Sequence, residues 1–580
     1  MLETDGIEPD EALLEGWRAR AERARAHLGW PVPGTRARRH ARGASLAVAA
    51  PSDQLYVATE VNEWALCATL FARSPSRWAA LEPLLLAAAL DNAADGESVI
   101  PPLLEERAAF ERFTRLASAE AQPALRALLA AAAARELPYL LDDDTLTLGS
   151  GAGGRDFPRA ALPAAAEVPW GELSGVPTAL VTGSNGKTTT VRLLAACARA
   201  HGWHAAYSCT DGVFLDREPL AAGDYSGPAG ARRVLRERRA QAALIETARG
   251  GILRRGIAVS SAAAAVVTNV SADHFGEYGV DHLEALADVK LTVAAVLGER
   301  GLLVLNADDA LLRVRATRLG ERFGRSPPCG WFALEDEAAP LAAHRARGGA
   351  TCGVRDGRLR LTAFGAAHDL GAVAAMPLTV EGSATYNIAN LAAAALAAAA
   401  LGIPPATIAL TFARFGSDPQ DNHGRLMRFE LDGVRVLIDY AHNPEGLRGL
   451  LAVAQHLRAG RGRLGLILGH AGNRQDADIE ALAQVAAAAR PQLIVVKENE
   501  AHLRGREPGE IPRLLRAGLL RAGLEEATLP QRGSELEAVR CALEWARPGD
   551  VLVLPVHSAA ARAAVLELIN ARSAHYSRSR

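Results

Sequence analysis

The pattern of hydrophobic and polar positions changes near Pro177, where short apolar runs begin to alternate with longer helix-favouring segments. Four of these runs predict buried strands, each followed by polar loop residues: Thr178–Val181, Ala242–Glu246, Ala264–Asn269 and Gly301–Leu305. Gly183–Lys187 predicts a loop and Thr188–His201 a helix. The alternation predicts a mostly parallel sheet with helices on both faces.

Two segments differ from this pattern. Thr351–Thr362, centred on Asp356-Gly357, predicts an antiparallel hairpin. From about Arg428 onward, four more apolar runs are separated by helical stretches, which predicts a second, smaller doubly wound domain. These four strands are Val434–Ile438, Leu464–Leu468, Leu493–Val496 and Val551–Leu554.

The first 165 residues have a mixed pattern. Leu125–Glu136 favours a helix, Thr145–Leu148 a short strand, and Gly149–Gly154 a flexible turn rather than a phosphate loop, because no lysine follows it. A chain of 580 residues is too long for one hydrophobic core. We therefore predict an α/β protein with an N-terminal α+β domain (1–165), a central phosphate-loop domain with a mostly parallel sheet (166–426) and a C-terminal Rossmann-like doubly wound domain (427–580).

Composition and charge restrict the partners and the cellular compartment that we expect for the protein. The net charge is −2 and the calculated pI about 6.8, so the totals do not point to nucleic acid as a partner. The N-terminus lacks a signal-peptide layout, and Leu391–Ile403 is too short to cross a bilayer. The six cysteines are scattered without a Cys-x-x-Cys pair. We expect a cytoplasmic protein without a membrane partner; the sequence does not decide between a monomer and a homo-oligomer.

The strongest chemical signal is the segment Ala179–Thr190. A strand ends at Val181, Gly183 and Gly186 allow close approach of an anion, and a helix then begins with its N–H groups free. Lys187 would contact the outer phosphates of a nucleotide, and the Thr188 hydroxyl would ligate Mg²⁺. The alternative is a tight strand-to-helix turn with an incidental lysine.

The sequence of this loop, Thr-Gly-Ser-Asn-Gly-Lys-Thr-Thr, resembles the Thr-Gly-Thr-Asn-Gly-Lys-Thr-Thr of the Mur ligase family. Ser184 replaces a threonine and keeps the hydroxyl. The resemblance implies ATP and Mg²⁺ as cofactors. It also implies that the nucleotide is bound by the loop residues Gly183, Ser184, Asn185, Gly186, Lys187, Thr188 and Thr189.

Metal ligands are expected at the ends of later strands. Glu246 ends one of them, and the resemblance gives it and Thr188 to Mg²⁺, with His274 as a second metal-side ligand. Lys290 lies where several Mur ligases carry a CO₂-modified lysine. From the residues alone, His274 fits a hydrogen-bonded structural role and Lys290 a solvated helix position.

Further motifs follow in the order of the family. The resemblance places Asn306 beside the adenine, Arg425 at the γ-phosphate and Asp439 on the ribose; single Asn and Asp residues are otherwise often caps or turn residues. Tyr386 stands where the family commonly has His, before Asn387. The nucleotide-binding set therefore adds Asn306, Asn387, Arg425, Asp439 and His442, and the catalytic set is Lys187, His274, Lys290 and Arg425.

Within the family, several segments resemble the Mur-type unit of cyanophycin synthetases, which joins arginine to the side chains of a polyaspartate: Ser208–Asp216, Ala222–Pro228, Glu246–Arg254 and Glu498–Glu510. Ala58–Trp64 and Leu146–Phe157 resemble the N-terminal region of the same enzymes. Only residues 158–182 separate that region from the phosphate loop, too few for the ATP-grasp domain those enzymes also carry. The resemblance therefore implies one ligation activity.

The expected reaction is ATP-dependent joining of a carboxylate acceptor, peptide-like or amino-acid-like, to an amino acid amine. Asp224 and Ser226 are candidates for acceptor recognition. The loop Gly469–Arg474, with Asn473 and Arg474, offers N–H groups and a guanidinium for an amino acid carboxylate, or is an ordinary strand–helix loop. Glu498 and Glu500 could hold a cationic side chain or be solvated. The alternatives are a cell-wall-precursor or folate-type ligase and a non-catalytic ATP-binding partner subunit.

Overall fold

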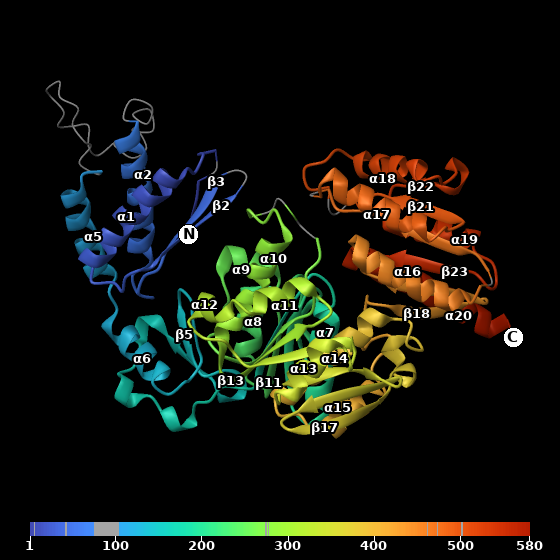
Figure 1. The fold of residues 1–580 in the computed structure, drawn as a ribbon, viewed down its shortest axis with the longest axis horizontal. Helices are drawn as coiled ribbons and strands as arrows, with labels where there is room; N and C mark the ends of the chain where they lie inside the picture. The colour runs from blue at the N-terminus through green and yellow to red at the C-terminus, as the bar shows by residue number, and fades with distance from the viewer. Residues whose placement is uncertain are drawn as a thin grey trace. The chain divides into compact units, whose positions relative to one another are not determined.

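The computed structural model describes residues 1–4, 6–40, 43–74, 104–272, 275, 278–460, 462–472, 474–499 and 503–579 (Figure 1). The chain forms two compact units. The first comprises Met1–Leu148, Asp156–Glu172 and Gly276–Asp281, and the second Gly149–Arg155, Leu173–Phe275 and His282–Arg580. The division into three domains stays a prediction, whereas the predicted α/β fold class is confirmed.

The first unit has α+β structure. Helices α1 (Glu11–His27), α2 (Leu55–Arg73) and α5 (Glu106–Glu120) form one core with the antiparallel strands β1 (Leu2–Glu3), β2 (Thr35–His40) and β3 (Gly43–Val48). The predicted helix appears as α6 (Pro123–Ala133), followed by β4 (Tyr139–Leu141) and β5 (Thr145–Leu148), which has the predicted bounds. Inside this core, Trp17 Nε1 donates a hydrogen bond to Asn62 Oδ1 (2.9 Å), so the buried indole keeps a polar partner.

The second unit contains an eleven-stranded sheet in the order β10-β9-β8-β11-β7-β12-β13-β14-β15-β16-β17. The strands from β8 to β15 are parallel, and antiparallel hairpins extend the sheet at both ends. The predicted hairpin at 351–362 is confirmed as β15 and β16. The strands are β7 (Thr178–Thr182), β8 (Ala205–Cys209), β9 (Gly212–Leu215), β10 (Glu218–Ala222), β11 (Ala242–Glu246), β12 (Ala262–Val267), β13 (Leu297–Asn306), β14 (Cys329–Glu335), β15 (Ala350–Arg355), β16 (Arg358–Ala363) and β17 (Ala366–Ala372).

Helices cover both faces of this sheet. The alternating side chains of β7, such as Ala179 and Val181, share one core with α7 (Lys187–Ala200), α14 (Thr385–Ala400) and α15 (Pro405–Phe412). Helix α8 (Pro228–Arg236) contacts β8 and β11 from outside that core. The other helices are α9 (Arg249–Arg255), α10 (Leu283–Lys290), α11 (Ala310–Ala316), α12 (Leu319–Phe323) and α13 (Ala339–Ala346). The carboxyl ends of β7, β11, β12 and β13 consequently meet at one edge.

A separate six-stranded sheet, in the order β18-β19-β23-β20-β21-β22, forms the C-terminal part. Its strands are β18 (Met427–Leu431), β19 (Val434–Asp439), β20 (Leu464–Leu468), β21 (Leu493–Lys497), β22 (Gln531–Arg532) and β23 (Val551–Pro555). All pairs except β18–β19 are parallel, so the doubly wound prediction is confirmed.

Two hydrophobic cores lie on the two faces of this sheet. One contains α16 (Pro444–Arg458), α17 (Asp476–Ala488) and α18 (Glu510–Arg521), and the other α19 (Glu535–Trp545) and α20 (Ala559–Ser579) (Figure 1). Within the described ranges, every helix is too short or too polar to span a membrane.

Candidate active site

The predicted phosphate loop joins β7 to α7. Gly183 has φ +146° and Gly186, which precedes α7, has φ +86°; both lie in the region that favours glycine. A Cβ at Gly183 would lie 1.8 Å from Thr268 Oγ1, and one at Gly186 would lie 2.2 Å from Asn390 Oδ1. Both glycines are therefore required by space as well as by dihedral angle.

Lys187 folds back over this loop. Its Nζ donates hydrogen bonds to the carbonyl oxygens of Gly183 and Ser184, each at 3.1 Å. The ammonium and the free N–H groups at the start of α7 thus gather positive charge at one place. A phosphate group is the ligand that such an arrangement suits.

The segment after β12 holds the loop in place. Thr268 Oγ1 donates to the carbonyl of Asn185 (2.5 Å), and the Asn185 N–H donates to Asn269 Oδ1 (2.9 Å). The Ser271 N–H donates to Ser184 Oγ (3.0 Å). Thr268, Asn269 and Ser271 were not among the predicted site residues, because the strand was predicted to continue to Asn269, whereas β12 ends at Val267.

Glu246 and Thr188 lie together beside the loop. Thr188 Oγ1 donates to Glu246 Oε2 (2.7 Å) and lies 3.2 Å from Thr210 Oγ1. Glu246 is 1% exposed, and within the described part of the chain its Oε1 has no hydrogen-bond partner. Burial raises the pKa of Glu246, while Lys187 and Thr188 oppose that effect. A buried carboxylate with an unmet oxygen next to a hydroxyl fits Mg²⁺, which prefers oxygen ligands.

The other two predicted metal-side residues are His274 and Lys290, about which the structure says less than about Thr188 and Glu246. His274 lies outside the described residues. Lys290 ends α10 and is 4% exposed, so it is not the solvated helix lysine considered above; its modification stays a prediction. In the portion of the chain that is described, no group of three or more His, Cys, Asp and Glu side chains is placed to hold a metal ion.

Arg425 reaches the same place from another segment. Its Nη2 donates to Thr210 Oγ1 (3.1 Å), which in turn lies beside Thr188, and its guanidinium lies 4.3 Å from the centre of the Tyr440 ring. Because a guanidinium on an aromatic face is held in orientation, Arg425 is placed rather than free to rotate. The structure thus brings Lys187, Thr188, Glu246 and Arg425 together.

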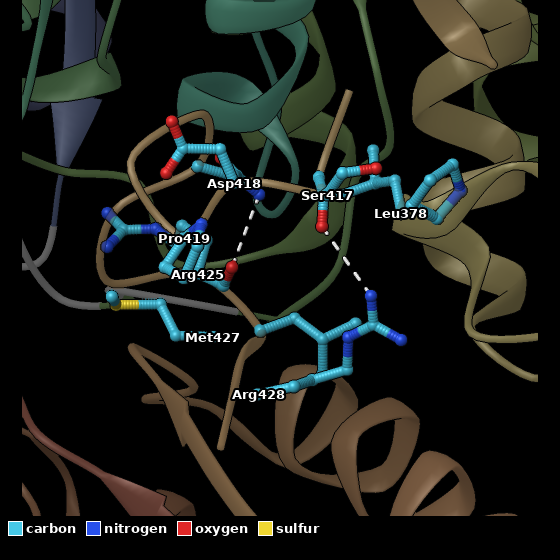
Figure 2. A pocket seen from close by; sticks show the side chains of 11 residues that line it. Leu378, Ser417, Asp418, Pro419, Arg425, Met427 and Arg428 are labelled. Atoms are coloured by element: carbon cyan, nitrogen blue, oxygen red, sulfur yellow. Dashed lines mark hydrogen bonds between the residues drawn. The ribbon is translucent and has the colours of Figure 1, made fainter. Parts of the chain in front are cut away.

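Arg425 also lines a pocket of about 190 Å³ (Figure 2). The pocket lies between the segment at 377–378 and the stretch 416–428, in which the Arg425 N–H donates to the Asn422 carbonyl (2.9 Å). On its lower side in Figure 2, Arg428 Nη2 approaches the Gly416 carbonyl (3.5 Å). The stretch is tied to α7 because Asn422 Nδ2 donates to Thr189 Oγ1 (3.3 Å).

The predicted nucleotide-binding asparagines hold the backbone around the loop. Asn306 Nδ2 donates to the Thr268 carbonyl (3.1 Å). Asn387 Nδ2 donates to the Leu378 carbonyl (3.0 Å), and its Oδ1 accepts from Asn390 Nδ2 (3.1 Å). Their amide groups support the segments on either side of the phosphate loop, and their contact with a nucleotide stays a prediction.

Asp439 is the last residue of β19, and His442 follows that strand. The Asp439 carboxylate accepts hydrogen bonds from the N–H groups of Leu426 and Ala441, both at 2.7 Å, and burial raises its pKa. The His442 ring lies 5.4 Å from that of Tyr440. Asp439 therefore fixes the junction between the stretch 416–428 and the C-terminal sheet; its predicted ribose contact is not tested.

One contact across these two parts of the second unit was missed in the sequence. Asn443, whose side chain caps α16, donates from Nδ2 to Asn185 Oδ1 (2.9 Å), and Asn185 Nδ2 donates to Glu445 Oε2 (3.4 Å). The Asn443-Pro444-Glu445 helix start was recognisable, but its partner in the phosphate loop is 258 residues away.

The predicted acceptor residues lie near the Glu246 side. Asp224 Oδ1 accepts from the Ser226 N–H (3.0 Å) and from its hydroxyl (2.6 Å), and the Ser226 carbonyl accepts from the Ala248 N–H (2.7 Å). The negative charge of Asp224 also acts to raise the pKa of Glu246. Asp224 and Ser226 thus form one loop next to the carboxylate.

The predicted amino acid site involves two loops of the C-terminal sheet. Arg506 joins them: its Nη2 donates to the Arg474 carbonyl (2.7 Å) and its Nε to the Gly472 carbonyl (3.0 Å). Glu498 Oε2 accepts from the Gly509 N–H (2.6 Å), so this carboxylate supports the second loop. Asn473 and Glu500 lie outside the described residues, and binding of an amino acid here is not tested.

The fold and the site define a class: a phosphate-loop protein whose α/β sheet is followed by a second, doubly wound sheet that contacts the loop. Residues 181–398 match the family profile "Mur ligase middle domain" and residues 424–555 match "Mur ligase, glutamate ligase domain". Together the two matches cover more than half of the chain, which therefore belongs to the Mur ligase family. The predicted resemblance is confirmed.

Three comparisons describe its relatives. A cyanophycin synthetase of Synechocystis sp. is 34% identical over 352 residues, 61% of this chain and 39% of its own length. A UDP-N-acetylmuramoyl-L-alanyl-D-glutamate–2,6-diaminopimelate ligase of Synechococcus sp. is 28% identical over 398 residues, 64% of this chain and 71% of its own length. The solved structure "E.coli FolC in complex with DHPP and ADP" aligns with a TM-score of 0.49 and 19% identity, over 68% of this chain and 89% of its own. The chain spans about two fifths of the length of the cyanophycin synthetase.

Proposed function

We propose that this protein is an ATP-dependent ligase that joins a carboxylate acceptor to the amine of an amino acid and releases ADP and phosphate. One observation carries the proposal: Thr188, hydrogen-bonded to the buried Glu246, and Arg425 meet at Thr210 beside the Lys187 loop. The loop supplies a phosphate site, and Glu246 with Thr188 suits a divalent cation. These are the parts that phosphoryl transfer requires.

In the first step, an oxygen of the acceptor carboxylate bonds to the γ-phosphorus of ATP, and the bond from that phosphorus to the bridging oxygen breaks. ADP leaves and an acyl phosphate remains. Lys187 and Arg425 neutralise charge on the transferred group. Thr188 and Glu246 would hold Mg²⁺, with His274 and Lys290 as the predicted further ligands; the bound ion supplies positive charge against the phosphates.

In the second step, the amine attacks the acyl carbon and the carbon–oxygen bond to phosphate breaks. The amine loses a proton and the amide is complete. We assign the acceptor to the Asp224–Ser226 loop and the carboxylate of the incoming amino acid to the loop ending at Arg474, which Arg506 ties to the neighbouring loop. A guanidinium and loop N–H groups are natural partners for that carboxylate.

The cyanophycin synthetase relatives support a basic amino acid and an aspartyl peptide as the pair of substrates. The alternative is a cell-wall-type acceptor, which the diaminopimelate ligase relative supports. A folate-type acceptor is a second alternative within the same family. A non-catalytic ATP-binding partner subunit is a further alternative, which the intact set of Lys187, Glu246 and Arg425 around Thr188 and Thr210 disfavours.

The test measures ADP release from ATP and Mg²⁺ with a panel of amino acids and short aspartyl peptides. We expect release that depends on both substrates and is abolished in Lys187→Ala, while a matched Arg540→Ala change on the exposed face of α19 leaves it intact. ADP formation by Lys187→Ala at the wild-type rate would contradict the proposal. Nucleotide binding without turnover across the whole panel would favour the partner-subunit alternative.

A further inference from the structure

A second group of charged side chains lies beside Arg425 and has no role in the steps above. Arg192, on α7, donates from Nη2 to Asp211 Oδ2 (2.8 Å), and Arg562, on α20, donates from Nη2 to Asp211 Oδ1 (2.6 Å). Arg192 Nη1 also donates to the His423 carbonyl (2.6 Å). The Asp211 carboxylate is thus shared by two guanidinium groups that lie far apart in the sequence of the second unit.

Arg562 is the incompletely satisfied member of this group. It is 3% exposed, and its Nε and Nη1 are buried without a hydrogen-bond partner among the described residues. Buried donors left unpaired cost free energy, and the cost is larger for a charged group. The guanidinium lies against Gly424 (φ +71°), where a Cβ would come within 2.9 Å of Cζ, Nε and Nη1. Because Gly424 has no side chain, it leaves room for the guanidinium and offers no side-chain acceptor to it.

Asp211 is the carboxylate that Arg192 and Arg562 share, and Arg425 lies close to it. Although burial acts to raise it, Arg425, Arg192 and Arg562 together hold the pKa of Asp211 below its usual range. Burial lowers the pKa of Arg562; Asp211 opposes this effect, and the charges of Arg425 and Arg192 add to it. Asp211 therefore pairs with two guanidinium groups in a largely buried place, while Arg425 also lies near Glu246 and Asp439 and acts to lower their pKa values. A buried guanidinium whose donors are only partly paired is stabilised when an anion joins it.

Adjacent residues separate this group from the phosphate side. Thr210 contacts Thr188 and Arg425, whereas Asp211, the next residue, contacts Arg192 and Arg562. The phosphates already have the loop, Lys187 and Arg425. The unmet donors of Arg562 are therefore not part of the set that is assigned to the phosphates.

We propose that Arg562 binds a carboxylate of the acceptor other than the one that is activated, and so helps to determine acceptor specificity. The inference rests on the proposed function, because it needs an acceptor beside the phosphate loop. A guanidinium that already contacts the Asp211 carboxylate has the geometry for a second one, since its N–H donors form a planar fork. The C-terminal part would then supply not only the amine site but one contact to the acceptor.

The test compares the binding of two probes, tetra-aspartate and tetra-asparagine peptides, to the full chain in the presence of ADP and Mg²⁺, by calorimetry. The variants are Arg562→Met, which removes the donors, and Arg562→Lys, which keeps the charge and loses the fork; Arg540→Met is the control. We expect the preference for tetra-aspartate to fall at least about tenfold in Arg562→Met, as for loss of one charge-assisted hydrogen bond. Arg562→Lys should fall between, and ADP affinity should stay within about twofold of wild type.

The ratio of the two peptide affinities separates binding from support of the fold. A structural role would change ADP affinity and thermal stability and leave the ratio unchanged, and that result would overturn the inference. Loss of ADP affinity alone would assign Arg562 to the phosphates and also overturn it. If the wild-type chain binds ADP and ignores tetra-aspartate, the inference fails, while the proposed ligation is still judged by ADP release with other acceptors.

Discussion

Lys497 gives the most quantitative prediction about the C-terminal sheet. It ends β21 and is 0% exposed, and its Nζ contacts Glu535 Oε1 and donates to the Pro555 carbonyl (2.7 Å). Glu535 also accepts hydrogen bonds from the N–H groups of His557 (2.9 Å) and Ser558 (2.8 Å). The pair therefore ties the end of β21 to the segment that follows β23.

Replacing Lys497 by Met leaves the Glu535 carboxylate buried without its cation. Removal of one partner of a buried ion pair costs about 3–5 kcal/mol, mostly as the penalty of the charge left behind. Since about 1.4 kcal/mol is a factor of ten, the amide hydrogens of β21 and β23 should exchange roughly 140- to 4,000-fold faster. The Lys497 side chain packs against Gly469, where a Cβ would lie 2.8 Å from its Cγ.

Hydrogen exchange followed by mass spectrometry on peptides covering β21 and β23 checks this prediction, because it reads local opening in a chain with more than one folded unit. The double variant Lys497→Met/Glu535→Leu removes both charges and should recover part of the loss. The matched control is Arg540→Met on α19. If Lys497→Met changes exchange by less than about threefold, or if the double variant exchanges as fast as the single one, the reasoning about the unpaired carboxylate is wrong.

Three further predictions concern the site and its surroundings. Gly186→Ala should weaken ADP binding at least about tenfold in calorimetry, through backbone strain plus contact with Asn390, whereas Gly402→Ala, with similar φ (+90°) and open space around it, should leave binding unchanged. Burial and the Lys497 charge lower the pKa of His557 to about 4. Because His557 takes up a proton near pH 6.5 in the unfolded chain and near pH 4 in the folded chain, the free energy of unfolding should fall by roughly 3 kcal/mol as the pH falls across that window. His557→Gln should make the free energy of unfolding less dependent on pH over the same range. Arg506→Gln should raise the KM for the amino acid and leave ADP affinity unchanged; a change in ADP affinity alone would contradict the assignment of that loop.

The elements with simple periodicity were predicted well from the sequence. Ala242–Glu246, Thr145–Leu148 and Leu464–Leu468 have their predicted bounds, because each is a short run bounded by polar or turn residues. The strand predicted at Gly301–Leu305 begins earlier, at Leu297, since the exposed Gly298-Glu299-Arg300 stretch hides its start. The pattern of hydrophobic residues in a sequence cannot reveal a strand end that is exposed and is held only by backbone hydrogen bonds.

The site was predictable only where its residues are adjacent in the chain. The strand–loop–helix around Lys187 follows from local chemistry. The contact between Asp211 and Arg562 spans 351 residues and depends on how α20 packs, for which neither residue type nor spacing gives a signal. Lys290 shows the same limit from the other side: its sequence fits a solvated helix lysine, and tertiary packing buries it.

Asn185 has a consequence for how the two substrates influence each other. Its main chain is bonded to the segment after β12, and its side chain to the first residues of α16. Filling the nucleotide loop and moving that helix therefore both act on Asn185, so the two events share a coupling free energy. By thermodynamic reciprocity, whatever factor the nucleotide imposes on amino acid affinity, the amino acid must return in equal measure.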